Sequence, residues 1–205
     1  DKQLEQFFDA ILDVGKPVLM RIGWEFNNRG HFDPQGYREG YRYIVDKMRL
    51  MDVSNVATLW HASVPDLNEL TGMQVLSEHP YMDFYPGDDY VDWWSISNFD
   101  PRGFRSPGTL EFYEQAASRE KPVFMGESAP WFGEAGKIMH FRDPVSMEES
   151  MTWFDDYFSL FEEYPHIKGM NVIIIDWQRW NWIWPHIPGG FNNTRLDLFP
   201  ELPEQ

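Results

Sequence analysis

Two glutamates in this sequence, Glu25 and Glu127, stand at the ends of short apolar segments, residues 18–26 and 122–127. Both segments have the length and composition of buried β-strands. Paired carboxyl groups suit the hydrolysis of a glycosidic bond, because one can protonate the leaving oxygen while the other attacks the anomeric carbon or activates water. If the reaction retains the sugar's configuration, we expect the two carboxyl groups to lie about 5–5.5 Å apart. The alternative interpretation is that both carboxylates are structural and sit in ion pairs.

The alternation of side chains along these segments predicts which way the glutamates point. One face of the first segment is entirely apolar and carries Val18, Met20, Ile22, Trp24 and Phe26. That face should pack against helices, so Arg21 and Glu25 on the other face should point into the interior of a barrel. In the second segment Glu127 shares a face with Val123 and Met125, opposite Gly126, and we expect it to point inward as well.

The neighbours of the two glutamates favour different protonation states, as paired catalytic carboxyls require. Glu25 lies between Trp24 and Phe26, and an apolar flank raises the pKa of a carboxyl toward that of an acid. Glu127 has a glycine and a serine as neighbours, which leave a nucleophile accessible.

Amphipathic helices alternate with apolar strands along the chain. Helices are predicted near residues 2–14, after an N-cap at Asp33, near residues 110–119, and after a capping box of Ser146 and Glu149. Strands are predicted at residues 18–26, 55–61, 91–98, 122–127 and 169–176. This alternation implies βαβ units and a parallel sheet, and no Gly-rich phosphate loop supports a Rossmann-type sheet. We therefore interpret residues 1–205 as a single α/β domain, a partial (β/α)8 TIM barrel with five of the eight units.

The composition excludes several classes of partner. The chain has 205 residues, with 33 acidic against 17 basic residues and a formal net charge of −16. Such a surface repels nucleic acid and anionic membranes but accepts a neutral polysaccharide. There is no apolar run long enough for a membrane span and no cysteine for disulfides or thiolate metal sites. The chain begins at Asp1 with no leader-like segment, so we expect a mature product or a fragment. As a separate expectation, the protein is secreted or periplasmic.

Active sites of such barrels lie where the strands end, so the ends of the predicted strands supply the candidates for sugar binding. These candidates are Arg21, Trp24, Asn27, Trp60, His61, Asn98 and Trp177. Trp60 and Trp177 could stack on sugar rings or could equally pack the barrel rim. The six histidines have no metal-ligand spacing, and the acidic residues at positions 88–92 fit no calcium loop. We therefore expect no metal and no cofactor.

Several motifs resemble those of the mannanase-type family 26 glycoside hydrolases. Arg21-Ile22-Gly23-Trp24-Glu25-Phe26-Asn27 is similar to the family's Arg-Pro-x-His-Glu-x-Asn, whose glutamate is the acid/base. Residues 121–128, ending in Gly126-Glu127-Ser128, resemble the strand that carries the nucleophile. Residues 55–60 and 85–93 look like the strands between them, and Tyr85-Pro86-Gly87-Asp88 is the most specific match. The resemblance covers nearly the whole chain.

The resemblance implies a retaining, endo-acting hydrolase of β-mannan, with Glu25 as acid/base and Glu127 as nucleophile. Trp24 replaces the family's usual histidine, which belongs to the subsite of the reacting sugar, so β-1,3-xylan and mixed-linkage glucan are alternative substrates. A non-catalytic carbohydrate-binding protein is an alternative of another class. The chain resembles the C-terminal five-eighths of the family's barrel, so we expect a second chain or an N-terminal segment to complete it.

Overall fold

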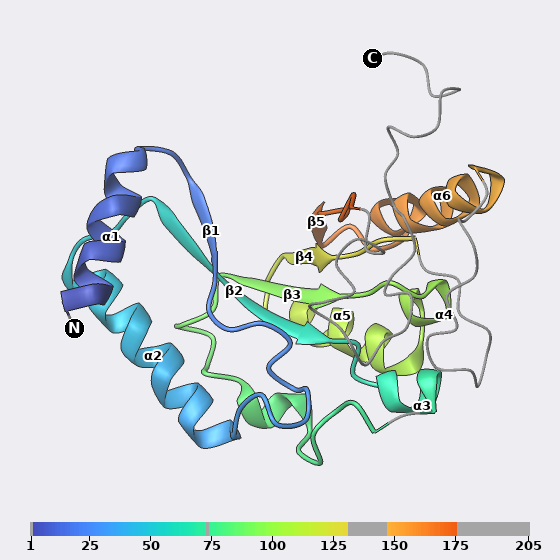
Figure 1. Ribbon diagram of the computed structural model, residues 1–205, viewed down its shortest axis with the longest axis horizontal. Coiled ribbons are helices and arrows are strands. Elements are labelled where there is room, and N and C mark those ends of the chain that lie inside the picture. Colours follow the sequence, from blue (N-terminus) through green and yellow to red (C-terminus); the bar gives the residue numbers. More distant parts are fainter. Residues whose placement is uncertain (1, 73, 131–146, 176–205) are drawn as a thin grey trace.

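The computed structural model describes residues 2–72, 74–130 and 147–175, in which one curled sheet of parallel strands is flanked by helices (Figure 1). The strands follow one another in chain order across the sheet: β1 Val18–Arg21, β2 Val56–Ser63, β3 Trp93–Ser97, β4 Val123–Glu127 and β5 Ile167–Met170. Because every neighbouring pair is parallel, each connection must cross over outside the sheet. This is the arrangement of part of a (β/α)8 barrel, and the predicted fold class is confirmed.

The helices begin where local signals place them. They are α1 Lys2–Val14, α2 Pro34–Leu50, α3 Leu67–Thr71, η1 Tyr81–Phe84, α4 Pro101–Phe104, α5 Pro107–Ser118 and α6 Met147–Glu163. Asp33 caps α2 as predicted, because its Oδ1 accepts a hydrogen bond from the Gly36 N–H at 2.9 Å. The helix predicted at residues 110–119 begins three residues earlier, since Ser106 is its N-cap and Pro107 occupies the first turn. Ser146 of the predicted capping box lies outside the described residues. Within the described part of the chain, no helix is long and apolar enough to cross a membrane.

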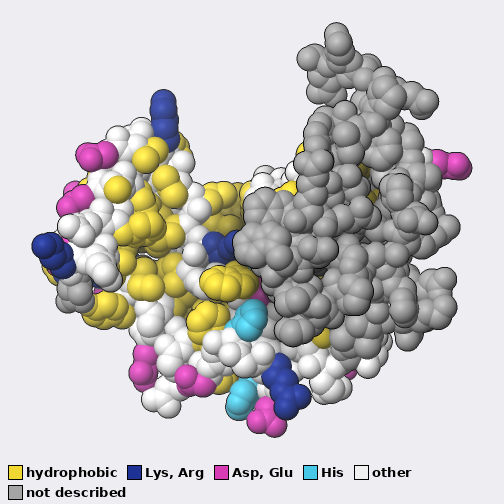
Figure 2. Space-filling model, in the orientation of Figure 1, with side chains coloured by type: hydrophobic (Ala, Val, Ile, Leu, Met, Phe, Trp, Pro, Cys, Tyr) yellow, Lys and Arg dark blue, Asp and Glu magenta, His cyan; other side chains and the backbone are white. Residues whose placement is uncertain are grey.

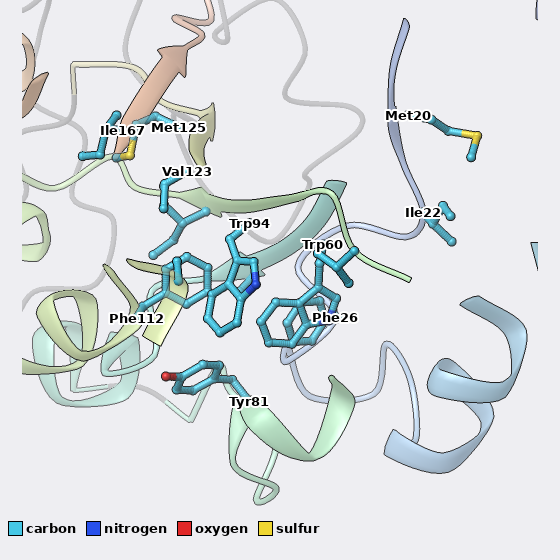
Figure 3. Packing of buried hydrophobic residues seen from close by; sticks show 14 of the residues in the cluster. Met20, Ile22, Phe26, Trp60, Tyr81, Trp94, Phe112, Val123, Met125 and Ile167 are labelled. Atoms are coloured by element: carbon cyan, nitrogen blue, oxygen red, sulfur yellow. The ribbon is translucent and has the colours of Figure 1, made fainter. Parts of the chain in front are cut away.

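The outer face of the sheet forms the core. Trp60 and Trp94 are fully buried there, and Figure 3 shows their rings between Phe26 and Phe112 of α5. Ring centroids are 4.4 Å apart for Phe26 and Trp60, and 4.7 Å apart for Trp60 and Trp94. Aromatic pairs of this kind contribute about 0.5–1.5 kcal/mol each beyond the area that they bury. Met20 of β1 packs in the same cluster, which leaves the alternate residues of the strands for the inner face.

The first strand is shorter than predicted, and this changes how Glu25 is placed. β1 ends at Arg21, after which Gly23 has φ of 71° and Glu25 has φ of 44°. A side chain at position 23 would find the Tyr37 ring only 3.0 Å from its Cβ, so a glycine suits both the turn and its packing. The predicted inward direction of Arg21 is confirmed, whereas Glu25 is positioned by a turn and not by strand alternation.

The alternation predicted for β4 is wrong, and a β-bulge is the reason. Val123 and Met125 are buried on the helix side, while Phe124 and Gly126 line the inner face. Ile96 of β3 pairs with Met125 and Ser97 pairs with Glu127, so Gly126 is one extra residue in β4. The extra residue reverses the direction of the next side chain, which turns Glu127 toward the inner face.

The fifth strand also lies earlier than predicted. The prediction covered residues 169–176, but β5 is Ile167–Met170. The following apolar segment stays beside β4 through two backbone hydrogen bonds, from the Asn171 N–H to the Met125 carbonyl at 2.8 Å and from the Ile173 N–H to the Ser128 carbonyl at 2.7 Å. These contacts bring Asn171 and Ile173 to the inner face.

Candidate active site

A hollow of about 550 Å³ opens on the inner face of the sheet. Its lining comes from β1, β2, β4 and the segment after β5: Leu19, Arg21, Leu59, His61, Phe124, Gly126, Glu127, Asn171 and Ile173. Figure 2 shows hydrophobic side chains over α1 and β1, with basic side chains and a histidine toward the centre of the view. The structure therefore brings together three of the predicted site residues, Arg21, His61 and Glu127.

An ion pair joins two sides of this hollow. The Arg21 Nη1 donates to Glu127 Oε1, and both side chains are partly exposed. In a flat sheet, strands three positions apart would be separated by roughly 14 Å. Direct contact between β1 and β4 therefore depends on the curl of the sheet. The contact fixes the orientation of the Glu127 carboxylate and leaves it open to the hollow.

Glu25 lies on the turn that follows β1. Its Oε2 accepts a hydrogen bond from the Asn28 Nδ2 at 2.8 Å. Burial raises the pKa of the Glu25 carboxyl, hydrogen bonding to Ser97 opposes that change, and the charge of Glu127 raises the pKa further. The charge of Glu127 thus acts directly on Glu25, and the two carboxyls have different surroundings. Glu25 is half-buried and, unlike Glu127, is not among the residues that line the hollow. A carboxyl with a raised pKa and an ion-paired carboxylate can supply an acid and a nucleophile.

The raised pKa of Glu25 predicts how the Glu25→Gln variant changes stability with pH. A carboxyl whose pKa is higher in the folded state than in the unfolded state binds more protons when folded, so the free energy of unfolding falls as the pH rises through that window. Glu25 therefore stabilises the fold below its unfolded pKa, and this contribution is lost as the pH passes its folded pKa. We expect Glu25→Gln to be more stabilising, relative to wild type, near pH 7 than near pH 4.

Urea unfolding of both proteins at the two pH values measures this difference. The exposed helical residue Glu114 offers a control, since Glu114→Gln removes a carboxylate from solvent. An equal effect of Glu25→Gln at both pH values would contradict the prediction.

His61 lies under the hollow as a neutral side chain. It is fully buried, with its Nδ1 2.9 Å from the Ser95 hydroxyl and its Nε2 2.7 Å from the Ser97 hydroxyl. Burial, together with the charge of Arg21, lowers the pKa of His61 to about 3. The ring therefore stays uncharged at ordinary pH and acts as a hydrogen-bonding group rather than as an acid.

Gly126 makes room for this imidazole, and its replacement should be costly. A Cβ at position 126 would lie 2.4 Å from both His61 Cε1 and Ser95 Oγ. Because His61 is held on both sides, we expect Gly126→Ala to lower the free energy of unfolding by roughly 1–3 kcal/mol or more. The matched control is Gly40→Ala in α2, where nothing lies within 4 Å of the new Cβ. That variant should be stabilising by about 0.5–1 kcal/mol, so similar denaturant midpoints for the two variants would refute the steric argument.

The remaining candidates for sugar binding occupy quite different places. Trp24 is 56% exposed beside the acid/base turn, with its ring edge-to-face against His31 at 6.2 Å. Asn27 is buried and joins the turn to the end of β2, because its amide exchanges hydrogen bonds with the Ser63 backbone at 2.8 and 3.1 Å. Asn98 is also buried, and its Nδ2 donates to the Gly103 carbonyl at 2.8 Å.

Trp60 lies on the helix side of the sheet with no exposed surface, so the expectation that it stacks on a sugar is wrong. Its place follows from the register of β2, where the neighbouring His61 takes the inner face. Trp177 lies outside the described residues.

Two serines of β3 were missed by the sequence reasoning. Ser95 and Ser97 are two apart in a strand, so they share a face, and both contact His61. This two-residue spacing is the sequence feature that could have predicted their place on the inner face. The residue type does not help, because serine is also common as a small packing residue. Among the described residues, no group of three or more acidic or histidine side chains could hold a metal ion.

Comparisons with known proteins agree with this geometry. The fold matches part of a modular endo-β-1,4-mannanase of glycoside hydrolase family 26 from Cellulomonas fimi, with a TM-score of 0.57 at 18% identity, over 82% of this chain and 39% of that one. In sequence, the chain is 25% identical to a β-1,3-xylanase from an Alcaligenes species, over 98% of this chain and 44% of the relative. The β-1,3-xylanase TXYA from a Vibrio species is 24% identical, over 94% and 43%.

The resemblance to family 26 that the motifs indicate is thus confirmed by structural neighbours, although no family model matches the sequence. The chain spans less than half the length of each of these relatives.

Proposed function

We propose that the chain is the catalytic part of a retaining glycoside hydrolase that cleaves a neutral β-linked polysaccharide. The observation that carries the proposal is the pairing of Glu25, whose pKa is raised by burial, with Glu127, which is ion-paired to Arg21 on the inner face. Glu127 attacks the anomeric carbon while Glu25 protonates the leaving oxygen, and a covalent glycosyl–enzyme forms. Glu25 then removes a proton from water as the water attacks the anomeric carbon and releases Glu127.

Arg21 orients the nucleophile in this mechanism. Its guanidinium holds Glu127 Oε1, so the carboxylate has one oxygen anchored and the other available for attack. Trp24 supplies an exposed indole next to the acid/base for contact with a sugar ring.

The substrate that we place first is β-1,3-xylan. The two proteins related in sequence over nearly the whole chain are named β-1,3-xylanases, whereas mannanases are related at lower identity. Trp24 also stands where the motif of the mannanase-type family has histidine, which favours a different fit of the reacting sugar. β-Mannan, the substrate implied by the motifs, is the second candidate.

Release of reducing ends from β-1,3-xylan, β-mannan and a mixed-linkage glucan tests the proposal. We expect hydrolysis of β-1,3-xylan, oligosaccharide products from internal cleavage, and a β-anomer as the first product by NMR. Binding of a polysaccharide without turnover would identify a carbohydrate-binding protein, and an α-anomer would identify inversion; either result would overturn the mechanism.

We further propose that strands from another chain or from an N-terminal segment complete the barrel of a secreted or periplasmic enzyme. Within the described residues β1 pairs only with β2, and Leu19 on its inner face is 45% exposed. An unpaired strand edge beside exposed apolar surface is a place where further strands add.

A further inference from the structure

The Asn28 side chain contacts the proposed acid/base directly. Its Nδ2 donates a hydrogen bond to Glu25 Oε2 at 2.8 Å, and the residue is buried, with only 9% of its surface exposed. The stretch that resembles the family 26 motif ends at Asn27, so this contact comes from the structure and not from the motif. Asn28 is therefore a candidate for a role in proton transfer that the resemblance does not supply.

The orientation of the Asn28 amide follows from the chemistry of its partner. The two ends of an amide differ in their hydrogen bonding, so the partners decide which end faces Glu25. The reverse orientation would bring Oδ1 against Oε2, and two acceptors repel each other when Glu25 is ionised. With Nδ2 toward Glu25, Oδ1 is buried and has no hydrogen-bond partner among the residues that the structure describes. The contact with Glu25 therefore determines which way the amide faces.

The backbone around Asn28 fixes the position of this amide. The Asn28 N–H donates to the Glu25 carbonyl at 2.9 Å and closes a turn between the two residues. An antiparallel bridge joins Asn28 to Leu76, and the Arg29 N–H donates to the Val75 carbonyl at 2.8 Å. The side chain thus starts from a backbone that is held on both sides, so its reach to Oε2 is set by the fold.

We propose that Asn28 is a positioning residue for the acid/base: its amide occupies Glu25 Oε2 and leaves Oε1 as the oxygen that gives and takes the proton. The inference rests on the proposed function, because Glu25 must be the acid/base for this contact to affect catalysis. In the first step the proton on Oε1 passes to the glycosidic oxygen, and in the second step Oε1 receives a proton from the attacking water. A donor on Oε2 also stabilises the ionised carboxylate, which is the form that accepts this second proton.

The direct test observes the Asn28 amide by ¹H–¹⁵N NMR as the pH is varied, in the whole protein and without substrate. We expect one Nδ2 proton of Asn28 to shift downfield as Glu25 ionises, because a carboxylate is a stronger acceptor than a carboxylic acid. The apparent pKa should equal that of the Glu25 carboxyl followed by ¹³C NMR, and Glu25→Gln should abolish the titration. An Asn28 amide that does not follow Glu25 would overturn the proposal.

Two substitutions measure what Asn28 does to Glu25. Asn28→Ala removes the donor, and Asn28→Asp keeps the shape of the side chain but replaces the donor with an acceptor. Glu127 with its partner Arg21, and His31, also act on Glu25 and stay in place in both variants. We expect both substitutions to raise the pKa of Glu25, and Asn28→Asp gives the readout if Asn28→Ala does not fold. An unchanged pKa of Glu25 in either variant would contradict the proposal.

The matched control is Asn55, which precedes β2 and so lies at the opposite end of that strand from the acid/base turn. Its Nδ2 donates to the Lys16 carbonyl at 2.9 Å, and its Oδ1 is also buried with no partner in the described part of the chain. Asn55→Asp adds the same charge as Asn28→Asp, and it should leave the pKa of Glu25 unchanged. An equal shift in the two variants would assign the effect to net charge and overturn the proposal.

These measurements need no substrate, so they separate this inference from the proposed function. If no polysaccharide is cleaved while the Asn28 amide still follows Glu25, the proposed function fails and the contact is structural. If the wild type is active, Asn28→Ala should lower kcat for a polysaccharide on the order of ten- to a hundredfold with little change in KM. It should also move the alkaline limb of the kcat/KM profile to higher pH. A wild-type kcat and pH profile in Asn28→Ala would remove Asn28 from catalysis.

Discussion

Glu127→Ala is expected to abolish hydrolysis, with kcat lower by at least roughly 10⁴-fold, because no covalent intermediate can form without the nucleophile. Binding of an unreacted oligosaccharide should persist, since Glu127 is one of nine residues that line the hollow. Steady-state kinetics give the first quantity and calorimetry of oligosaccharide binding gives the second.

A chemical rescue sharpens this expectation. In Glu127→Ala, azide can enter the space of the lost carboxylate and attack the anomeric carbon of an activated β-glycoside, which yields the α-glycosyl azide. The exposed Glu114 of α5 provides the control, because Glu114→Ala should keep full activity. Wild-type turnover in Glu127→Ala, or a β-glycosyl azide from it, would show that another residue is the nucleophile.

Glu25→Ala should affect substrates according to their leaving group. In a polysaccharide the leaving group is a sugar alkoxide, which leaves poorly unless it is protonated. Turnover of a polysaccharide should therefore fall about 10²–10⁴-fold. An aryl glycoside with an acidic phenol needs little protonation, so formation of its glycosyl–enzyme should be nearly normal. A burst of phenol followed by slow turnover would reveal this, because deglycosylation loses its general base.

An equal loss for both kinds of substrate would contradict the assignment of Glu25 as acid/base. Azide should accelerate the slow second step in this variant and give the β-glycosyl azide, the opposite anomer from that expected for Glu127→Ala. The pair of variants therefore separates the two roles by product stereochemistry as well as by rate.

The parts of the fold that could be predicted from sequence depend on local interactions. The amphipathic spacing of residues 2–14 predicts α1 with its observed bounds, and Asp33 with Pro34 predicts the start of α2. The apolar face of residues 18–22 correctly places Arg21 on the inner side, because packing against helices selects one face of a strand.

The parts that could not be predicted depend on contacts between distant segments. The bulge at Gly126 is defined by pairing with β3, and nothing within β4 alone distinguishes it from a regular strand. The turn that ends β1 depends on the Tyr37 ring of α2 beside Gly23. Trp60 and His61 are adjacent in sequence, and only the register of β2 decides which of them enters the core.

The bulge also determines which changes in chain length the inner face can accept. Glu127 points inward because β4 contains one residue more than β3 over the same stretch. Removal of a single residue from β4 would restore a regular ladder and carry the carboxylate to the helix side, with every side chain of the site chemically intact. Insertions in the loops between strands carry no such penalty. Only the number of residues within the paired part of β4 decides which face of the sheet the Glu127 side chain reaches. Length variation during the evolution of such a sheet should therefore collect in its connections, while the number of residues in β4 stays constant.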